Sequence, residues 1–157
     1  MFTTNLCRLV YFSRSNIEGT PGDVAAELAD ILSRAQGRNA ASEVTGVLLT
    51  TRTSFAQLIE GRPADIRDTY KRIFDDKRHR SLRLIVLEPI VTRRFGDWAM
   101  EHVQASDDVG ELLQDMTMDI HSASDEERGV IGDQVVDLMV KHLNPSTVQA
   151  AKPRVTA

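Results

Sequence analysis

The segment from Ser54 to Gly61, with the sequence SFAQLIEG, constrains the fold of this chain most strongly. If the segment is a strand, Phe55, Gln57 and Ile59 share one face, because strand side chains alternate with a period of two. Two of these side chains are apolar. The third is an amide, which when buried must satisfy its N–H donors and its carbonyl acceptor. The pattern predicts a buried strand that carries one polar group among apolar neighbours.

The chain before this segment predicts a strand, a helix and a second strand. Apolar residues of both parities indicate a central strand over residues 6–13. Residues 22–36 repeat apolar side chains at helical spacing and end at Gly37, which is typical of a helix C-terminus. Residues 38–43 are then expected to form a loop, and residues 44–50 form the next strand. A three-residue connection joins that strand to the opening segment and predicts a hairpin.

The chain after this segment predicts a second helix and one or two further strands. The helix follows Pro63 and ends in the charged run 75–80. Residues 82–87 have little polar interruption, which favours a central strand, and residues 95–100 are expected to start an edge strand. The order is βαββαβ(β), which predicts an α+β, ferredoxin-like sheet with two helices on one face.

The other face of such a sheet needs a cover, and two C-terminal amphipathic helices are expected to supply it. Their apolar stripes lie within residues 109–116 and 130–143, and Ser124 precedes Glu127 as a helix-capping residue does. We therefore predict a main domain over residues 1–104, a helical appendage over 105–145 and a disordered tail over 146–157.

The composition excludes several classes of function. Cys7 is the single cysteine of the 157 residues, so a disulfide framework or a cysteine metal cluster is excluded, and no metal site is expected. The net charge of −4 argues against a nucleic-acid partner. The sequence shows neither a secretory signal nor a membrane-spanning segment, so we expect a cytoplasmic protein.

Three short motifs carry side chains that could bind a ligand. Arg38 and Asn39 either populate a polar turn or present a guanidinium and an amide to a polar ring edge or a phosphate. His79 lies in a charged run that is typical of a solvated helix end. Trp98 and Met100 share a strand parity, which is most often simple packing.

Five motifs, in their order and spacing, resemble one family. They are CRLVYFS at residues 7–13, Asn39 followed by VTG at 44–46, FAQLIEG at 55–61, DKRH at 76–79, and RF at 94–95 before WAM at 98–100. Together they are similar to the BLUF domain, a flavin-binding blue-light sensor, over residues 6–103. The C-terminal part resembles the helical pair of short, stand-alone BLUF proteins.

The resemblance implies a role for each motif. Tyr11 would be the light-driven electron and proton donor, and Gln57 would bridge Tyr11 and the N5/O4 edge of the flavin. Asn39 would hold the pyrimidine edge of the ring, with Arg38 beside it. The remaining implied residues are Asp76 and His79 near the ring or ribityl chain, the apolar walls Ile31, Leu48 and Phe55, and the signal-relay pair Trp98 and Met100.

The resemblance also implies a cofactor and partners. FAD is the expected flavin, with FMN and riboflavin left open. Without an effector domain, the protein would be a sensor rather than an enzyme, would signal to an effector protein in trans, and would form a homo-oligomer. Two alternatives remain: a small ferredoxin-like enzyme that binds an acyl phosphate through Arg38 and Asn39, and a chromophore-free interaction module that docks through its acidic helices.

Overall fold

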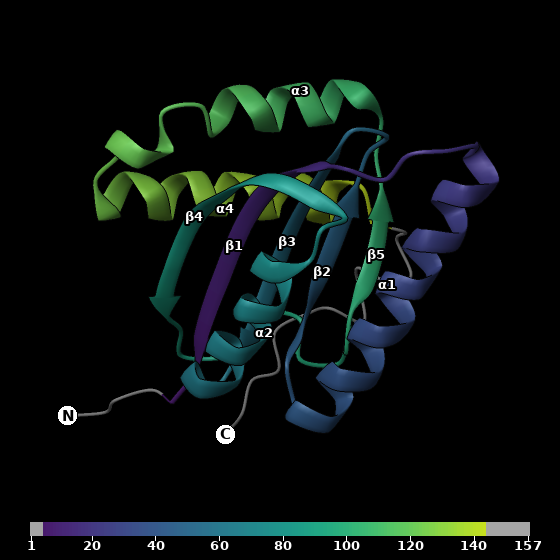
Figure 1. Ribbon diagram of the computed structural model, residues 1–157. Coiled ribbons are helices and arrows are strands. Elements are labelled where there is room, and N and C mark those ends of the chain that lie inside the picture. The colour runs from purple at the N-terminus through teal and green to yellow at the C-terminus, as the bar shows by residue number, and fades with distance from the viewer. Residues whose placement is uncertain (1–4, 144–157) are drawn as a thin grey trace.

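A five-stranded mixed sheet forms the centre of the molecule in the computed structural model, which describes residues 5–143 (Figure 1). The strand order is β4-β1-β3-β2-β5, and all neighbours are antiparallel except β2 and β5. The strands are β1 (Cys7–Ser15), β2 (Thr45–Thr50), β3 (Ser54–Gly61), β4 (His79–Pro89) and β5 (Glu101–Gln104). The α+β, ferredoxin-like prediction is confirmed, as is the hairpin of β2 and β3.

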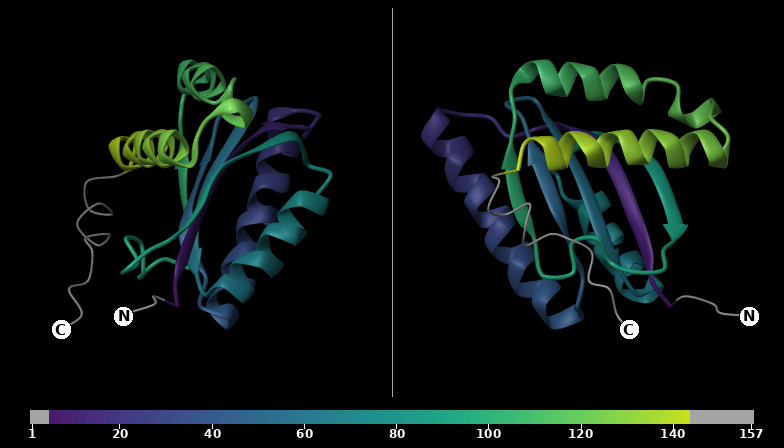
Figure 2. Two further views of the ribbon diagram at one scale, coloured as in Figure 1. Left: turned by 90° about the vertical axis from the view of Figure 1, so that its left-hand side faces the viewer. Right: turned by 180° about the vertical axis from the view of Figure 1, so that it is seen from behind.

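Two helical layers enclose the sheet (Figure 2). The helices α1 (Pro21–Ser42) and α2 (Pro63–Asp75) lie on one face. On the other face lie α3 (Asp107–Met116), a short 3-10 helix (Ile120–Ser122) and α4 (Asp125–Lys141). The predicted C-terminal cover is therefore present. None of the helices within residues 5–143 is both long and apolar enough to cross a membrane.

The sheet separates two apolar cores, because alternate residues of each strand point to opposite faces. The core beneath α3 and α4 takes Val10, Phe12 and Leu58 from the central strands. The core beneath α1 and α2 takes Leu9, Tyr11 and other residues of the opposite parity. Tyr11 thus lies on the α1/α2 face, as does every side chain of β3 that shares the parity of Gln57.

Side-chain caps fix where two of the helices begin. Thr20 accepts a hydrogen bond from the Asp23 backbone N–H at the start of α1, and the Asp23 carboxylate accepts one from the Thr20 backbone N–H. At α4, the Ser124 hydroxyl accepts from the Glu127 N–H, as the sequence predicts. Each cap satisfies donors that a helix start would otherwise leave unpaired.

The first helix is longer than predicted, and this corrects the placement of two candidate residues. It continues through Gly37 to Ser42 and ends at Glu43, whose φ of 58° is left-handed. Gly37 is exposed, and its missing side chain would meet nothing within 4 Å. A single exposed glycine costs a helix only about 1 kcal/mol, which neighbouring turns offset. Arg38 and Asn39 therefore lie in the helix rather than in a loop.

Two strand predictions are wrong in position. The strand predicted to be central, β4, is an edge strand. Leu84 packs against the core under α1 and α2, and Ile85 and Val86 pack against the core under α3 and α4. Apolar residues are therefore needed on both faces of β4 although it lies at the edge of the sheet. Residues 95–100 form no strand, and β5 begins only at Glu101.

The predicted domain boundary after residue 104 coincides with the end of β5. The division into a main domain and an appendage stays a prediction. The predicted disordered tail, residues 146–157, lies outside the described residues.

Candidate functional site

A cavity of about 470 Å³ lies between α1 and α2, with the sheet as its floor. Its volume is within the range of small-molecule and cofactor pockets. Nearly all of the predicted site residues line it, namely Tyr11, Ile31, Arg38, Asn39, Leu48, Phe55, Gln57, Asp76 and His79. Side chains that the sequence analysis did not single out also line it: Arg34, Ala35, Thr69, Arg72, Ile73, Asp75 and Arg78.

Tyr11 and Gln57 meet on the floor of this cavity. They are directly paired across β1 and β3, and the Tyr11 hydroxyl donates a 2.7 Å hydrogen bond to Gln57 Oε1. Both side chains are buried. Burial, with smaller contributions from Asp76 and Tyr70, raises the pKa of Tyr11 far above its ordinary value. The phenol is therefore neutral at every physiological pH, and it keeps its proton on the side of Gln57.

The other end of the Gln57 amide faces Met100. Gln57 Nε2 donates to Met100 Sδ at 3.3 Å, and Met100 is 3% exposed. Trp98 instead packs against the core under α3 and α4, where its ring stacks on Phe95 with centroids 5.4 Å apart. The structure thus separates the predicted pair: Met100 belongs to the site and Trp98 to the opposite core.

Two amides from the last turns of α1 hold the chain just before β5. Asn39 is 2% exposed, and its Nδ2 donates to the Ala99 carbonyl at 2.6 Å. Gln36 Nε2 donates to the Met100 carbonyl at 3.0 Å. The Asn39 side chain also lines the cavity, so its amide lies where it could contact a ligand.

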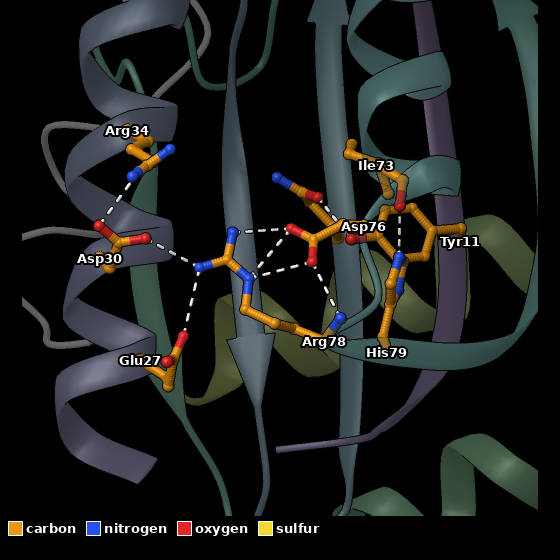
Figure 3. Close-up of polar contacts among 9 residues, drawn as sticks. Tyr11, Glu27, Asp30, Arg34, Ile73, Asp76, Arg78 and His79 are labelled. Atoms are coloured by element: carbon orange, nitrogen blue, oxygen red, sulfur yellow. Dashed lines mark hydrogen bonds and ion pairs between the residues drawn. The ribbon is translucent and has the colours of Figure 1, made fainter. Parts of the chain in front are cut away.

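An ionic cluster ties α1 to the loop after α2 (Figure 3). Both Asp76 oxygens accept from the Arg78 guanidinium at 2.7–3.2 Å, and Oδ1 also accepts from the Arg78 backbone N–H at 2.9 Å. From the same guanidinium, Nη1 reaches Asp30 at 2.9 Å and Glu27 at 3.5 Å on α1. Burial raises the pKa of Asp76, but the bonds from Arg78 outweigh it and leave that pKa below its ordinary value.

His79 lies between the aromatic rings of the cavity. Its ring is 6.0 Å from that of Tyr11 and 6.3 Å from that of Phe55, both in edge-to-face geometry. Nε2 is bonded to the Ile73 carbonyl, which can only accept, so Nε2 carries a proton. Nδ1 lies 2.8 Å from the Ser13 hydroxyl and accepts from it in the neutral imidazole. These two bonds fix the ring orientation.

Sequence reasoning missed Arg78 because a charged run beside a helix end is usually solvated. A signal for the cavity that Arg78 lines was nevertheless available in the sequence. Thr69, Arg72, Ile73 and Asp76 recur at a spacing of three or four, which places them on one side of α2 and its C-terminal cap. The polar face so defined, opposite the polar residues of α1, would have predicted a ligand cavity between the helices.

Apolar walls and convergent amides suit a flat, polar-edged ring. Ile31, Leu48 and Phe55 supply apolar surface, and Gln57 and Asn39 supply amide groups. Within residues 5–143 there is no cluster of three or more side chains that could hold a metal ion. The fold and site together define an α+β domain whose cavity between two helices suits an organic cofactor.

Comparison with known proteins gives the family. Residues 6–101 match the BLUF model, described as sensors of blue light using FAD. This is more than half of the chain, so the chain belongs to the BLUF family of flavin-based blue-light sensors.

Curated relatives match a stretch of similar length. The chain is 35% identical over 99 residues to photoactivated adenylate cyclase subunit beta of Euglena gracilis, covering 62% of this chain and 11% of the relative. It is 33% identical over 96 residues to the blue light- and temperature-regulated antirepressor BluF of Escherichia coli K12, covering 61% and 23%. The chain thus spans only about a tenth to a quarter of the length of these relatives.

Solved structures match more of the chain. The dark-state structure of the BLUF protein BlrB has a TM-score of 0.63 and 29% identity, covering 87% of this chain and 92% of that one. The ground state of BlsA has a TM-score of 0.61 and 27% identity, covering 71% and 72%. The coverage by BlrB exceeds residues 6–101 and so extends into the C-terminal helices.

Proposed function

We propose that this chain senses blue light through the Tyr11–Gln57 pair and passes the signal to a separate protein. The observation that carries the proposal is the buried 2.7 Å hydrogen bond from the Tyr11 hydroxyl to Gln57 Oε1 on the floor of the cavity. A bound flavin supplies the light absorption and the oxidising excited state. The protein supplies a donor, a path for its proton, and a hydrogen-bond pattern that can change.

Tyr11 is suited to give up an electron and a proton together. Its raised pKa keeps the phenol protonated, so loss of an electron makes the proton strongly acidic. Gln57 Oε1 is the acceptor to which that hydroxyl points. When the electron returns, the proton returns to the phenol oxygen, and the pair is chemically restored.

The Gln57 amide is the group whose orientation or tautomer can stay changed after the electron has returned. In the present arrangement Oε1 faces a donor, and Nε2 faces the weak acceptor Met100 Sδ. A rotated or tautomeric amide would present a different group to Tyr11, to Met100 and to the ring edge. Where water is excluded, a mismatched donor costs about 1–3 kcal/mol, which shifts a two-state equilibrium by roughly fivefold to a hundredfold.

The other cavity residues would hold the cofactor. The Asn39 amide, which lines the cavity, suits the pyrimidine edge of a flavin, whose imide N–H needs an acceptor. Arg38, Asp76 and His79 would lie at the edge of the ring or along the ribityl chain. Ile31, Leu48 and Phe55 would contact its apolar faces.

FAD is the flavin that we propose, with FMN as the runner-up. The description of the family names FAD, and BlrP1 of Klebsiella pneumoniae, which is 27% identical, was solved with FMN. The cavity supports a phosphate-bearing flavin over riboflavin, because Arg34, Arg38 and Arg72 all line it. Guanidinium groups bind phosphate oxygens in a fixed, two-pronged geometry.

Output through a partner in trans, without catalysis by this chain, completes the proposal. The cyclase and antirepressor relatives are far longer than the matched region, whereas the structural match to BlrB covers 92% of that chain.

A homo-oligomer is part of the same proposal. It draws support from large apolar side chains exposed on the C-terminal helical layer, among them Leu112, Met118 and Val130.

A visible absorption spectrum tests the proposal. Protein purified in the dark from flavin-replete cells is expected to be yellow, to shift to the red under blue light, and to revert in the dark. Chromatography of the released chromophore would identify the flavin. A colourless protein would contradict the proposal. Release of phosphate from an acyl phosphate would then favour the enzyme alternative, and partner binding without a chromophore would favour the interaction module.

A further inference from the structure

The segment from Arg93 to Met100, here called the strap, lies in the connection between β4 and β5 and forms neither a helix nor a strand. It carries Trp98 into one core and Met100 into the other. Irregular backbone of this kind has few hydrogen bonds of its own, so its position depends on the groups that bind its ends.

A buried carboxylate binds the start of the strap. Glu60 is the penultimate residue of β3 and is 2% exposed. Its Oε2 accepts from the Arg94 backbone N–H and its Oε1 accepts from the Phe95 backbone N–H, both at 2.8 Å. Each oxygen thus has its own backbone donor, and charge-assisted bonds of this kind are about twice as strong as neutral ones.

The end of the strap is held from α1 and β2. Asn39 and Gln36 donate to the carbonyls of Ala99 and Met100, and the Gly46 N–H donates to the Trp98 carbonyl at 3.1 Å. These three donors are neutral amides, whereas the Glu60 anchor at the start of the strap is charged. The strap therefore lies between a carboxylate at one end and neutral amides at the other.

The anchor and the proposed switch share one strand. Gln57 and Glu60 are three residues apart on β3, so they point to opposite faces of the sheet. Gln57 touches Met100 at the end of the strap, and Glu60 binds its start. Between these points Phe95 is 1% exposed and stacks on Trp98, which limits the ways in which the strap can move.

We propose that Glu60 is a positioning residue: its two-oxygen anchor fixes the strap so that Met100 stays against Gln57, and thereby sets the lifetime of the light-induced state. The proposal rests on the proposed photosensory function. The role requires a carboxylate, because a neutral amide has one accepting oxygen and would leave one of the two backbone N–H groups unpaired.

The charges around Glu60 indicate when the anchor would weaken. Burial raises the pKa of Glu60 above its ordinary value, against the two backbone hydrogen bonds and the charges of Arg93 and Arg8. On the neighbouring elements, Arg8 also pairs with Glu88 and Asp133, and Arg94 lies 4.0 Å from Asp137. As the pH falls, Glu60 is neutralised earlier than an ordinary glutamate, and the strap loses a charged anchor.

Glu60→Gln tests the proposal, with Glu88→Gln as the matched control on the outer strand β4. We expect dark recovery of Glu60→Gln to be roughly tenfold faster, the size expected for one lost charged hydrogen bond. Recovery of the wild type should also accelerate as the pH falls, and Glu60→Gln should lack that acceleration. Flavin affinity should be unchanged, and Glu88→Gln should recover as the wild type does.

Hydrogen exchange in the dark tests the anchor without photochemistry. The Trp98 amide, which donates to the Phe95 carbonyl, should exchange faster in Glu60→Gln than in the wild type or Glu88→Gln. A wild-type protein without a light-induced absorption shift would refute the proposed function. The exchange rate of the Trp98 amide would still show whether Glu60 holds the strap. A photoactive wild type with unchanged recovery and exchange in Glu60→Gln would overturn only the present inference.

A second variant covers the case in which Glu60→Gln does not fold. The Arg93 guanidinium binds the carbonyls of Glu43 and Glu60 and the Thr45 hydroxyl from the same end of the strap. Arg93→Gln should accelerate recovery and Trp98 exchange in the same direction. Wild-type values for both in a folded Arg93→Gln would overturn the proposal.

Discussion

The two faces of the sheet are built from the same strands but packed in opposite ways. Beneath α3 and α4, Phe12, Leu49 and Leu113 are at most 1% exposed and belong to one continuous apolar cluster. Beneath α1 and α2, a cavity of about 470 Å³ remains, and polar groups such as Gln57 and Asn39 reach into it. One face is filled for stability, and the other is left hollow for a cofactor.

A single strand shows how the chain encodes this difference. In β3, Ala56 and Leu58 point to the filled face, whereas Phe55, Gln57 and Ile59 point to the hollow one. The period of two lets neighbouring residues serve different purposes. Stability and photochemistry can therefore be altered separately.

The largest difference is expected from matched truncations on the two faces. Leu113→Ala on the filled face should lower the free energy of unfolding by about 3–5 kcal/mol, since it opens a new void in a close-packed core. Leu48→Ala borders an existing cavity and should cost only about 2–3 kcal/mol, the lower end of the same range. Urea unfolding of the flavin-free protein measures both, and equal costs would contradict a hollow face.

A smaller effect is expected at the mouth of the cavity. Asp30→Asn removes one arm of the cluster through which Arg78 joins α1 to the loop after α2. Exposed ion pairs contribute little, so flavin dissociation should accelerate by no more than about fivefold, and added salt should reduce the difference. Asp65→Asn, which breaks the Arg62 pair on α2, is the control and should leave dissociation unchanged.

The pH range of this effect follows from Asp30. Hydrogen bonds from Arg78 and Arg34 lower the pKa of Asp30 below its ordinary value. The carboxylate is thus charged at neutral pH, and the pair is lost only as the pH falls through that lowered pKa. Dissociation rates of wild type and Asp30→Asn should converge at acid pH. A constant ratio across the whole pH range would contradict the role of the ion pair.

The sequence predicts most of the fold because the strands follow simple alternation. The bounds of β3 are predicted correctly, and Tyr11 pairs with Gln57 in the register that β1 and β3 adopt. The end of α1 could not be predicted, since Gly37 looks like a terminator and only tertiary contacts show that the helix continues. Because the helix continues, Asn39 lies within it and is only 2% exposed.

The strap could not be predicted for a related reason. Alternation places Trp98 and Met100 on the same side, but alternation holds only for strands, and these residues precede β5. Their opposite directions depend on bonds from Glu60, Asn39 and Gln36, which come from distant parts of the chain. Glu60 itself reads as an ordinary strand-end carboxylate until its two backbone donors are seen.

The light-minus-dark absorption spectrum of Gln57→Leu tests the central claim most directly. Leucine keeps the volume of the side chain but removes the carbonyl that accepts from Tyr11 and the amide that faces Met100. The account predicts a folded, flavin-binding variant with no reversible red shift, while the wild type shows one. A reversible red shift of wild-type size in Gln57→Leu would contradict the account.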